Sequence, residues 1–183
     1  MIPERFSSLL KSADEVQKRW DKKEQIGGGC NGAVYRACKD KSSRDCAYVI
    51  KVQPFNGQAK AELRAYHSLQ GSGLTPRLHA AWRRGRNMYM VIDRLVPCKP
   101  QLRRKEVFAL LDKLERRGWV HVDTHDGNIM CTESRRGNQK PVLIDFGWSV
   151  HRDDAPFRRH PAGERSFDKL RDVQRENVLD CFR

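Results

Sequence analysis

A polar segment, His121-Val122-Asp123-Thr124-His125-Asp126-Gly127-Asn128, lies in the second half of this 183-residue chain, directly before the apolar pair Ile129-Met130. A second acidic segment, Leu143-Ile144-Asp145-Phe146-Gly147, places Asp145 seventeen residues after Asn128. Two unrelated acidic turns would be the simplest interpretation. However, a histidine, an aspartate and an asparagine at fixed spacing, followed by a strand, a turn and Asp-Phe-Gly, form a long ordered pattern, which residues upstream extend.

Glycines at positions 27, 29 and 32 form a G-x-G-x-x-G spacing that runs into Val34. Taken alone, this spacing fits a dinucleotide-binding fingerprint, a kinase phosphate flap or three turn glycines. A dinucleotide fold needs a helix after the glycines, whereas the β-prone Ala33-Val34-Tyr35 follows here. No Lys-Ser/Thr pair of a Walker motif follows the last glycine. The spacing therefore favours a flap between two antiparallel strands.

A lysine interrupts the apolar segment Val49-Ile50-Lys51-Val52. It could lie on an edge strand and point to water. Glu62 follows eleven residues later in a predicted helix, on the same face as Tyr66 and Leu69. Because a buried charge is costly unless it is paired, we expect an ion pair between Lys51 and Glu62.

The hydrophobic periodicity and the turn residues predict an alternation of strands and helices along the chain. The expected helices cover residues 5–23, 58–70, 102–117 and 165–182, and the expected strands cover 46–53, 77–84, 87–94, 129–132 and 141–145.

The ordered motifs together resemble those of the protein-kinase superfamily over about residues 25–150. The resemblance implies an α+β, bilobal protein-kinase-like fold. Residues 25–95 would form an N-lobe with a five-stranded antiparallel sheet, and residues 96–183 a truncated, mainly helical C-lobe. Residues 1–24 would form an N-terminal helical extension.

The same resemblance implies a role for each motif residue. Asp123 would be the catalytic base, Lys51 would contact the α- and β-phosphates of ATP and be held by Glu62, and Asn128 and Asp145 would bind Mg²⁺. Ile92 would be the gatekeeper, and Asp93 and Leu95 would offer backbone groups to adenine. The expected ATP-binding set is Ile26, Gly27, Gly29, Gly32, Val34, Ala47, Lys51, Ile92, Asp93 and Leu95, and the apolar spine would contain Tyr66, His121 and Phe146.

Several positions depart from the pattern of ordinary kinases. Val122 replaces an arginine that meets a phosphorylated activation loop, so we expect activity without such phosphorylation. His125 replaces the lysine of Ser/Thr kinases and could neutralise phosphate charge when protonated. Only 36 residues follow Gly147, without an Ala-Pro-Glu motif. This compactness is similar to that of the small KEOPS kinase subunit, bacterial effector kinases and compact kinases of large DNA viruses. Asp168 would brace the catalytic loop, unless it is a solvated helix acid.

The resemblance favours a minimal ATP-dependent kinase acting on protein Ser/Thr hydroxyls. Two alternatives stay open. One is a partner-dependent scaffold or pseudokinase with a kinase fold. The other is a small-molecule phosphotransferase, which is suggested by the presence of His125 where Ser/Thr kinases have a lysine. A simple nucleic-acid-binding module would explain the positive charge but not the ordered motifs.

The formal net charge of +13 indicates a polyanionic neighbour without identifying it. Nine Lys and Arg residues and one acid fall within residues 77–105, which could be a solvated face or dock an acidic protein partner or a nucleic acid. No apolar stretch is long enough for a membrane span, and no secretory signal is visible. The six cysteines form no C-x-x-C pair of the kind that binds zinc. Because no secretory signal is visible, we expect a reducing compartment with free thiols, and a cytoplasmic or nuclear protein, inside a host cell if it is viral or an effector.

Overall fold

The computed structural model describes residues 9–29, 32–39, 46–98, 104–132, 139–154 and 166–180. The chain divides into two compact units. Unit 1 contains Met1–Gln70 and Pro76–Arg94, and unit 2 contains Gly71–Thr75 and Leu95–Arg183. None of the helices in the described ranges is long and apolar enough to cross a bilayer.

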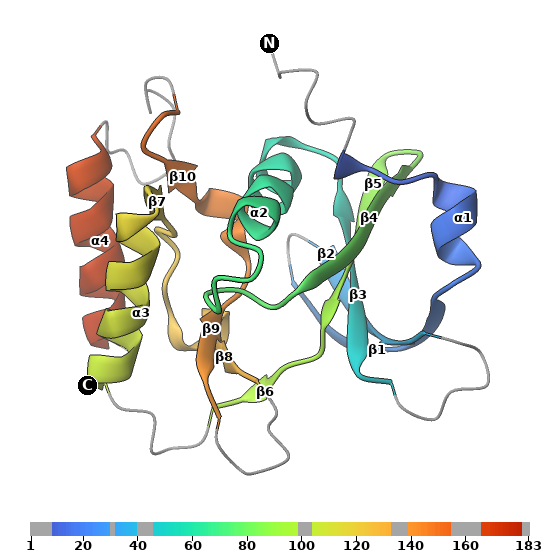
Figure 1. The fold of residues 1–183 in the computed structure, drawn as a ribbon, viewed down its shortest axis with the longest axis horizontal. Helices are drawn as coiled ribbons and strands as arrows, with labels where there is room; N and C mark the ends of the chain where they lie inside the picture. The colour runs from blue at the N-terminus through green and yellow to red at the C-terminus, as the bar shows by residue number, and fades with distance from the viewer. Residues whose placement is uncertain are drawn as a thin grey trace. The chain divides into compact units, whose positions relative to one another are not determined.

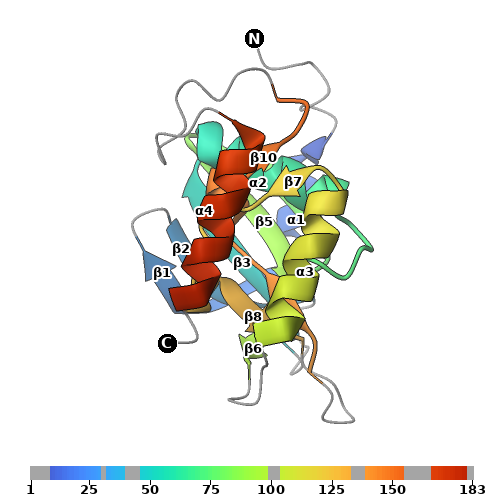
Figure 2. The same cartoon turned by 90° about the vertical axis from the view of Figure 1, so that its left-hand side faces the viewer.

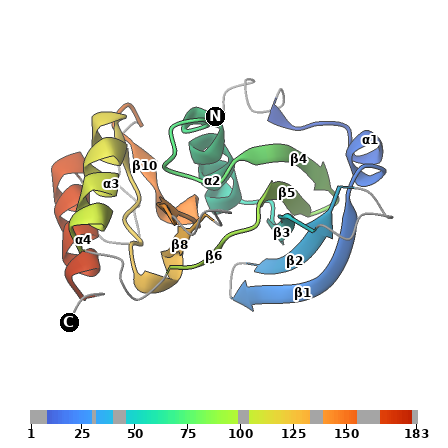
Figure 3. The same ribbon diagram turned by 60° about the horizontal axis from the view of Figure 1, so that its bottom comes forward.

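Unit 1 is built on a five-stranded antiparallel sheet with the strand order β1-β2-β3-β5-β4. This confirms the predicted sheet. Figure 3 shows β1 and β2 as a long hairpin at its edge. The strands are β1 (Asp21–Gly29), β2 (Gly32–Cys38), β3 (Tyr48–Pro54), β4 (Leu78–Arg84) and β5 (Asn87–Asp93).

Two helices of unit 1 pack against this sheet. The short helix α1 (Ala13–Gln17) contributes Val16 to a core that includes Ile50 and Trp82. Helix α2 (Gly57–Ser68) begins at Asn56, whose side chain accepts a hydrogen bond from Ala59 N–H at 2.9 Å. Because strand residues alternate between faces, α2 meets the face opposite to Ile50, the face to which Lys51 points.

The expected helix over residues 5–23 is largely wrong within the described residues, and its first four residues lie outside them. Only α1 is helical, and β1 starts at Asp21, before the boundary expected at residue 25. Pairing of Asp21 with Cys38 and of Lys22 with Ala37 extends the sheet. Such long-range ladder pairing overrides a local helical periodicity.

Unit 2 contains two long helices and short strands. Helices α3 (Arg104–Arg116) and α4 (Phe167–Asp180) lie side by side (Figures 1 and 2). As predicted, α3 buries an apolar face. Strands β6 (Val96–Pro97), β8 (Ile129–Cys131) and β9 (Pro141–Leu143) form one sheet, and β7 (Trp119–Val120) pairs with β10 (Val150–His151). The two-residue strands β6, β7 and β10 are too short to give a periodic signal, so the sequence did not predict them.

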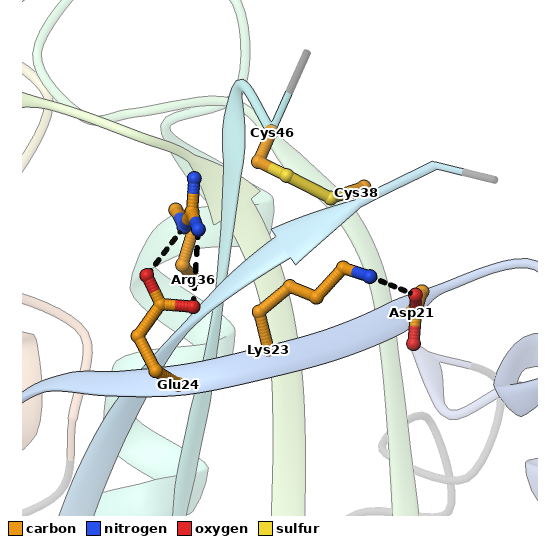
Figure 4. Close-up of a disulfide and its surroundings, with 6 residues drawn as sticks. All are labelled: Asp21, Lys23, Glu24, Arg36, Cys38 and Cys46. Carbon is orange, nitrogen blue, oxygen red and sulfur yellow. Dashed lines mark hydrogen bonds and ion pairs between the residues drawn. A yellow bond between two sulfur atoms is a disulfide. The ribbon is translucent and has the colours of Figure 1, made fainter. Parts of the chain in front are cut away.

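The expectation of free thiols is wrong for four of the six cysteines. Cys38 at the end of β2 is bonded to Cys46 just before β3, and Cys98 is bonded to Cys131 in β8. Figure 4 shows the first of these disulfides above the ion pairs Lys23–Asp21 and Arg36–Glu24. The pairs form because ladders place the cysteines close together, which spacing along the sequence does not reveal. Cys30 and Cys181 lie outside the described residues.

Candidate active site

The predicted ion pair of Lys51 and Glu62 is present in unit 1. Lys51 Nζ lies 2.7 Å and 2.9 Å from the two carboxylate oxygens of Glu62. The Glu62 side chain is fully buried, and Gln53 Nε2 donates a further hydrogen bond to it at 2.6 Å. Sequence reasoning missed Gln53, because an uncharged amide needs no oppositely charged partner when it is buried and therefore gives no signal in the sequence. The three side chains fix the ammonium group of Lys51 on the face of the sheet that meets α2.

Strand register places most of the predicted ATP-binding residues of unit 1 on one sheet face. Val34 is opposite Lys51, and Ile92 is opposite Val49. Directly opposed residues point to the same face of an antiparallel sheet. Ala47 lies just before β3, and its carbonyl accepts a hydrogen bond from Arg94 N–H at 2.8 Å. Gly27 pairs with Val34, and Gly29 pairs with Gly32, so the glycines extend the same face. Ile26 is half exposed at the start of this glycine run.

Gly32 is the glycine whose position excludes a side chain. Its φ is +151°, and a Cβ there would overlap the carbonyl oxygen of Val52. By contrast, nothing lies within 4 Å of a Cβ added to Gly29. The glycines therefore lie in a β1–β2 hairpin that packs closely against β3, as expected for a flap. The next element after this hairpin is a strand and not a helix.

The segment after Ile92 ends unit 1. Asp93 N–H donates to the carbonyl of Arg77, and the Asp93 carboxylate accepts from Arg77 N–H at 3.1 Å and lies 2.7 Å from His79 Nε2. The backbone group that Asp93 could offer to an adenine is therefore its carbonyl oxygen. Leu95, the other expected adenine contact, belongs to unit 2 and is half buried.

The polar loop of unit 2 brings Asp123 and Asn128 together. Asn128 Nδ2 lies 2.9 Å from the backbone oxygen of Asp123 and 3.2 Å from its carboxylate oxygen Oδ2. Asn128 is buried and belongs to the 3₁₀ helix η2 (Asp126–Asn128). His125 Nδ1 accepts from Gly127 N–H at 3.1 Å, which leaves Nε2, 4.0 Å from Asp123 Oδ1, as its other polar atom. A carboxylate, an amide and an imidazole thus share one loop.

The same loop holds Ile144, the residue before Asp145, at both of its backbone groups. Ile144 N–H donates to the carbonyl of Asn128 at 3.0 Å, and the carbonyl of Ile144 lies 2.7 Å from His121 Nε2. Because a carbonyl can only accept, Nε2 of His121 carries the proton. Asp145 then adopts a left-handed conformation with φ 59°. The loop and the Asp145 turn are therefore fixed to each other within unit 2.

His121 is a structural residue of this loop. Burial lowers its pKa to about 4, so the ring is neutral near pH 7. Its ring centroid lies 4.5 Å from that of Phe146, edge to face, in agreement with the expected apolar spine for these two residues. Tyr66, the third expected spine residue, is buried in unit 1.

Helix α4 braces the catalytic loop through residues that the sequence did not single out. Gln174 Oε1 accepts from His121 N–H at 2.6 Å, and the Gln174 carbonyl accepts from Thr124 Oγ1 at 2.7 Å. Asn177 Nδ2 donates to the carbonyl of Val122 at 2.8 Å. Asp168 does not have this role, because its side chain is exposed and pairs with Arg171 on the same helix. The alternative of a solvated helix acid was correct for Asp168.

The donor set of unit 2 fits a magnesium ion. Hydrogen bonding of the Asn128 amide nitrogen to Asp123 leaves Oδ1 as the amide atom suited to a hard cation, and the Asp145 carboxylate would be a second oxygen ligand. Across the described ranges, no group of three or more His, Cys, Asp and Glu side chains could hold a metal ion. Mg²⁺ characteristically takes one or two protein ligands and completes its shell with phosphate oxygens and water.

An ion-paired lysine on an antiparallel sheet and a loop that joins Asp123, Asn128 and Ile144 are typical of kinase-like phosphotransferases. The model of the phosphotransferase enzyme family, APH, matches residues 57–153, more than half of the chain. The chain belongs to this family and is a kinase-like phosphotransferase. No curated protein sequence matches it.

The matched range decides which assignments the family membership supports. It contains Glu62, the Ile92–Leu95 segment, the catalytic loop and Asp145, but it begins after the glycine hairpin and Lys51. The roles of the hairpin and of Lys51 therefore depend on their geometry in unit 1. The narrower likeness to compact viral, effector or KEOPS kinases stays a prediction.

Proposed function

We propose that this protein transfers the γ-phosphate of ATP to Ser or Thr hydroxyls of a protein, with Asp123 as the base that orients and deprotonates the acceptor. The observation that carries the proposal is the Asp123–Asn128 hydrogen bond in a loop that also fixes the turn of Asp145. Membership of a phosphotransferase family supports the reaction class. The acceptor and the use of ATP are our inference.

Each residue has a physical task in this proposal. The Asp123 carboxylate accepts the proton of the attacking hydroxyl, and Asn128 limits the rotation of that carboxylate. Lys51 offsets negative charge on the phosphates, and Glu62 keeps its ammonium group in one orientation. Asn128 and Asp145 would hold Mg²⁺, which supplies charge neutralisation for the phosphate oxygens when it is bound. His125, with its ring partly exposed, could contact phosphate when protonated.

The remaining ATP contacts follow from the sheet face of unit 1. Val34, Ala47 and Ile92 offer apolar surface to the adenine ring, and Asp93 and Leu95 offer backbone groups to its edge. The hairpin from Ile26 through Gly27 and Gly29 to Gly32 presents backbone amides suited to phosphate oxygens.

The position of Val122 supports activity without activation-loop phosphorylation. The side chain is buried, so this position presents no cation to a phosphate. Protein treated with a phosphatase should therefore transfer phosphate as fast as untreated protein. A rate that rises only after phosphorylation would contradict this part of the proposal.

A small-molecule acceptor is the second candidate. The family assignment specifies phosphotransfer without a protein acceptor, and His125 replaces the lysine expected in Ser/Thr kinases. A panel of protein acceptors and of hydroxyl-bearing small molecules, tested with the same enzyme preparation, separates the two candidates. Transfer to small molecules alone would replace the first candidate with the second.

The reaction itself is tested with labelled ATP, Mg²⁺ and acceptor, using the wild type beside Asp123→Ala and Lys51→Ala. Both changes should lower the rate by about two to four orders of magnitude, because positioning and electrostatics supply most of the catalysis. Transfer that survives both changes would exclude the proposal. Nucleotide binding without any transfer would favour the partner-dependent scaffold, particularly if a partner restores activity.

A partner could dock on part of the basic segment 77–105. Lys99 and Arg103 lie outside the described residues, and the other basic residues of the segment belong partly to unit 1 and partly to unit 2. In unit 1, Arg83 and Lys60 both lie over the ring of Phe55, at 4.5 Å and 4.8 Å from its centroid. Residues 54–92 hold one acid, Glu62, which is buried. This group of Lys60, Arg83 and Phe55 suits an acidic protein segment. The two cations already cover the ring of Phe55, so the ring is not presented to a nucleic-acid base.

The docking hypothesis is tested by charge reversal at Arg83, Arg84 and Arg86. The triple change to Glu should raise the KM for an acidic protein acceptor and leave the Kd for ATP unchanged. Unchanged KM values for acidic acceptors would identify these residues as a solvated face. Weaker binding of RNA, with acidic acceptors unaffected, would indicate a nucleic-acid partner.

A further inference from the structure

We propose that Gln174 and Asn177 of α4 are positioning residues, which act on the reaction by holding the backbone around Asp123. This inference rests on the proposed role of Asp123 as the base. Three hydrogen bonds from α4 reach the loop, at His121 N–H, at the carbonyl of Val122 and at Thr124 Oγ1. Asp123 itself lies between two of the residues that are held in this way.

The backbone next to Asp123 needs such support. Val122 has φ 71°, in the left-handed region, where a β-branched residue is strained. Conformations of this kind persist only where the surroundings impose them. Gln174 holds the N–H of His121, the residue before Val122, and Asn177 holds the carbonyl of Val122 itself. The direction in which the Asp123 side chain leaves the backbone is therefore set by α4.

Gln174 is itself held in place. Its side chain is fully buried, and its Nε2 donates to Glu115 Oε1 of α3 at 3.1 Å. Arg175 contacts both carboxylate oxygens of Glu115 and also Asp112, at distances from 2.6 to 3.0 Å. Arg175 thus anchors Glu115, and Glu115 orients the amide of Gln174, so that its oxygen faces His121.

A positioning role has a defined kinetic signature. Misplacement of a catalytic group by about 1 Å costs about 100-fold in rate. ATP contacts in unit 1 do not depend on α4, so nucleotide affinity should stay constant. The expected effect is thus a fall in kcat with KM for ATP unchanged.

The variants Gln174→Met and Asn177→Leu keep about the same side-chain size and remove the side-chain hydrogen bonds to His121 N–H and to the Val122 carbonyl. The bond from Thr124 Oγ1 to the backbone carbonyl of Gln174 stays in both variants. Each should lower kcat for transfer from ATP by about 10- to 100-fold, with KM for ATP within about twofold of the wild type. Glu176→Gln is the matched control, because Glu176 is exposed on the same helix, and it should keep the wild-type kcat. Wild-type kcat in both Gln174→Met and Asn177→Leu would overturn the inference.

A second measurement separates positioning from loss of folded protein. If Gln174 acts through Asp123, Gln174→Met should have less than a twofold effect in an Asp123→Asn background, because the base is already absent. An equal effect of Gln174→Met in both backgrounds would identify a merely structural role and overturn the inference. If Gln174→Met fails to fold, the same double-mutant cycle is measured with Asn177→Leu in the Asp123→Asn background.

The cycle also distinguishes failure of this inference from failure of the proposed function. If Asp123→Asn retains wild-type transfer, Asp123 is not the base and the proposed function fails with everything that rests on it. If Asp123→Asn lowers kcat but Gln174→Met and Asn177→Leu do not, the proposed function stands and only the positioning role is overturned.

Discussion

At the scale of single residues, the Glu62 carboxylate depends on Lys51 for its charge balance. It is fully buried, and its donors include Lys51 and the neutral amide of Gln53. Removal of one partner of a buried ion pair is costly because the other charge stays uncompensated. Lys51→Met should therefore lower the free energy of unfolding by about 3 to 5 kcal/mol, measured by urea denaturation.

The double variant Lys51→Met/Glu62→Leu is the control for this prediction. It replaces both charges with apolar groups of similar size, so most of the lost stability should return. Its phosphotransfer activity should stay absent, because the cation is missing. Equal stability of the wild type and Lys51→Met would contradict the burial argument.

His121 makes the stability depend on pH in a defined window. Its pKa is about 4 in the folded protein, and the ordinary value is 6.5. Above pH 6.5 the ring is neutral in both states and contributes no pH dependence. As the pH falls from 6.5 to 4, the unfolded state binds a proton that the folded state does not, so the folded protein loses about 3 kcal/mol.

Unfolding of the wild type and of His121→Gln between pH 7.5 and 4 tests this assignment. Glutamine keeps an N–H donor for the carbonyl of Ile144 but does not titrate. The wild type should lose stability more steeply than the variant below pH 6.5. Parallel curves would show that His121 protonates equally in both states.

Sequence reasoning succeeded at residues whose charge conflicts with their surroundings. A lysine within an apolar strand and a glutamate on an apolar helix face each require a partner, so Lys51 and Glu62 could be paired in advance. Gln53 and Gln174 carry no charge, and amides in strands and helices are usually solvated. Asp168 was predicted to brace the loop because it is an acid, but the hydrogen bonds to the loop are made by Gln174 and Asn177.

At the scale of elements, the strands and helices with clear periodicity were predictable, and the elements defined by pairing were not. Helix α3 and the hairpin β4–β5 follow local patterns of apolar residues and a turn at Gly85. The first half of β1 has polar residues and acquires its conformation from the ladder with β2. The catalytic loop could be recognised by its motif, but the left-handed Val122 has no sequence signal.

The β1–β2 hairpin has one glycine that the packing demands. Gly32→Ala should lower the free energy of unfolding by about 1 to 3 kcal/mol, because its Cβ would overlap the Val52 carbonyl and its φ is positive. Gly29→Ala is the matched control, since its Cβ has open space, and it should change stability by less than about 1 kcal/mol. Thermal unfolding of both variants measures the difference. Similar losses in the two would argue against a closed hairpin.

At the scale of the whole molecule, the disulfides are the feature that was predicted wrongly from the sequence. The absence of C-x-x-C pairs argues against a metal cluster, but it does not argue against long-range disulfides. In unit 2, Val96 of β6 is opposite Cys131 of β8, so the pairing of these strands places Cys98, which directly follows β6, near Cys131. Disulfides persist in oxidising compartments, so these bonds weigh against the reducing location expected from the sequence.

The Cys98–Cys131 bond should stabilise the folded chain more than the Cys38–Cys46 bond does. It closes a loop with a sequence separation of 33, compared with 8 for the other bond. Because a cross-link restricts the unfolded chain more when its loop is longer, Cys98→Ser/Cys131→Ser should cost about 4 kcal/mol and Cys38→Ser/Cys46→Ser about 2 to 3 kcal/mol. Urea denaturation without reductant measures both costs, and mass spectrometry of a non-reducing digest identifies the linked peptides. Alkylation of all four cysteines in native protein kept under oxidising conditions would refute the pairing, whereas linked peptides with equal stabilities would refute only the loop-length argument.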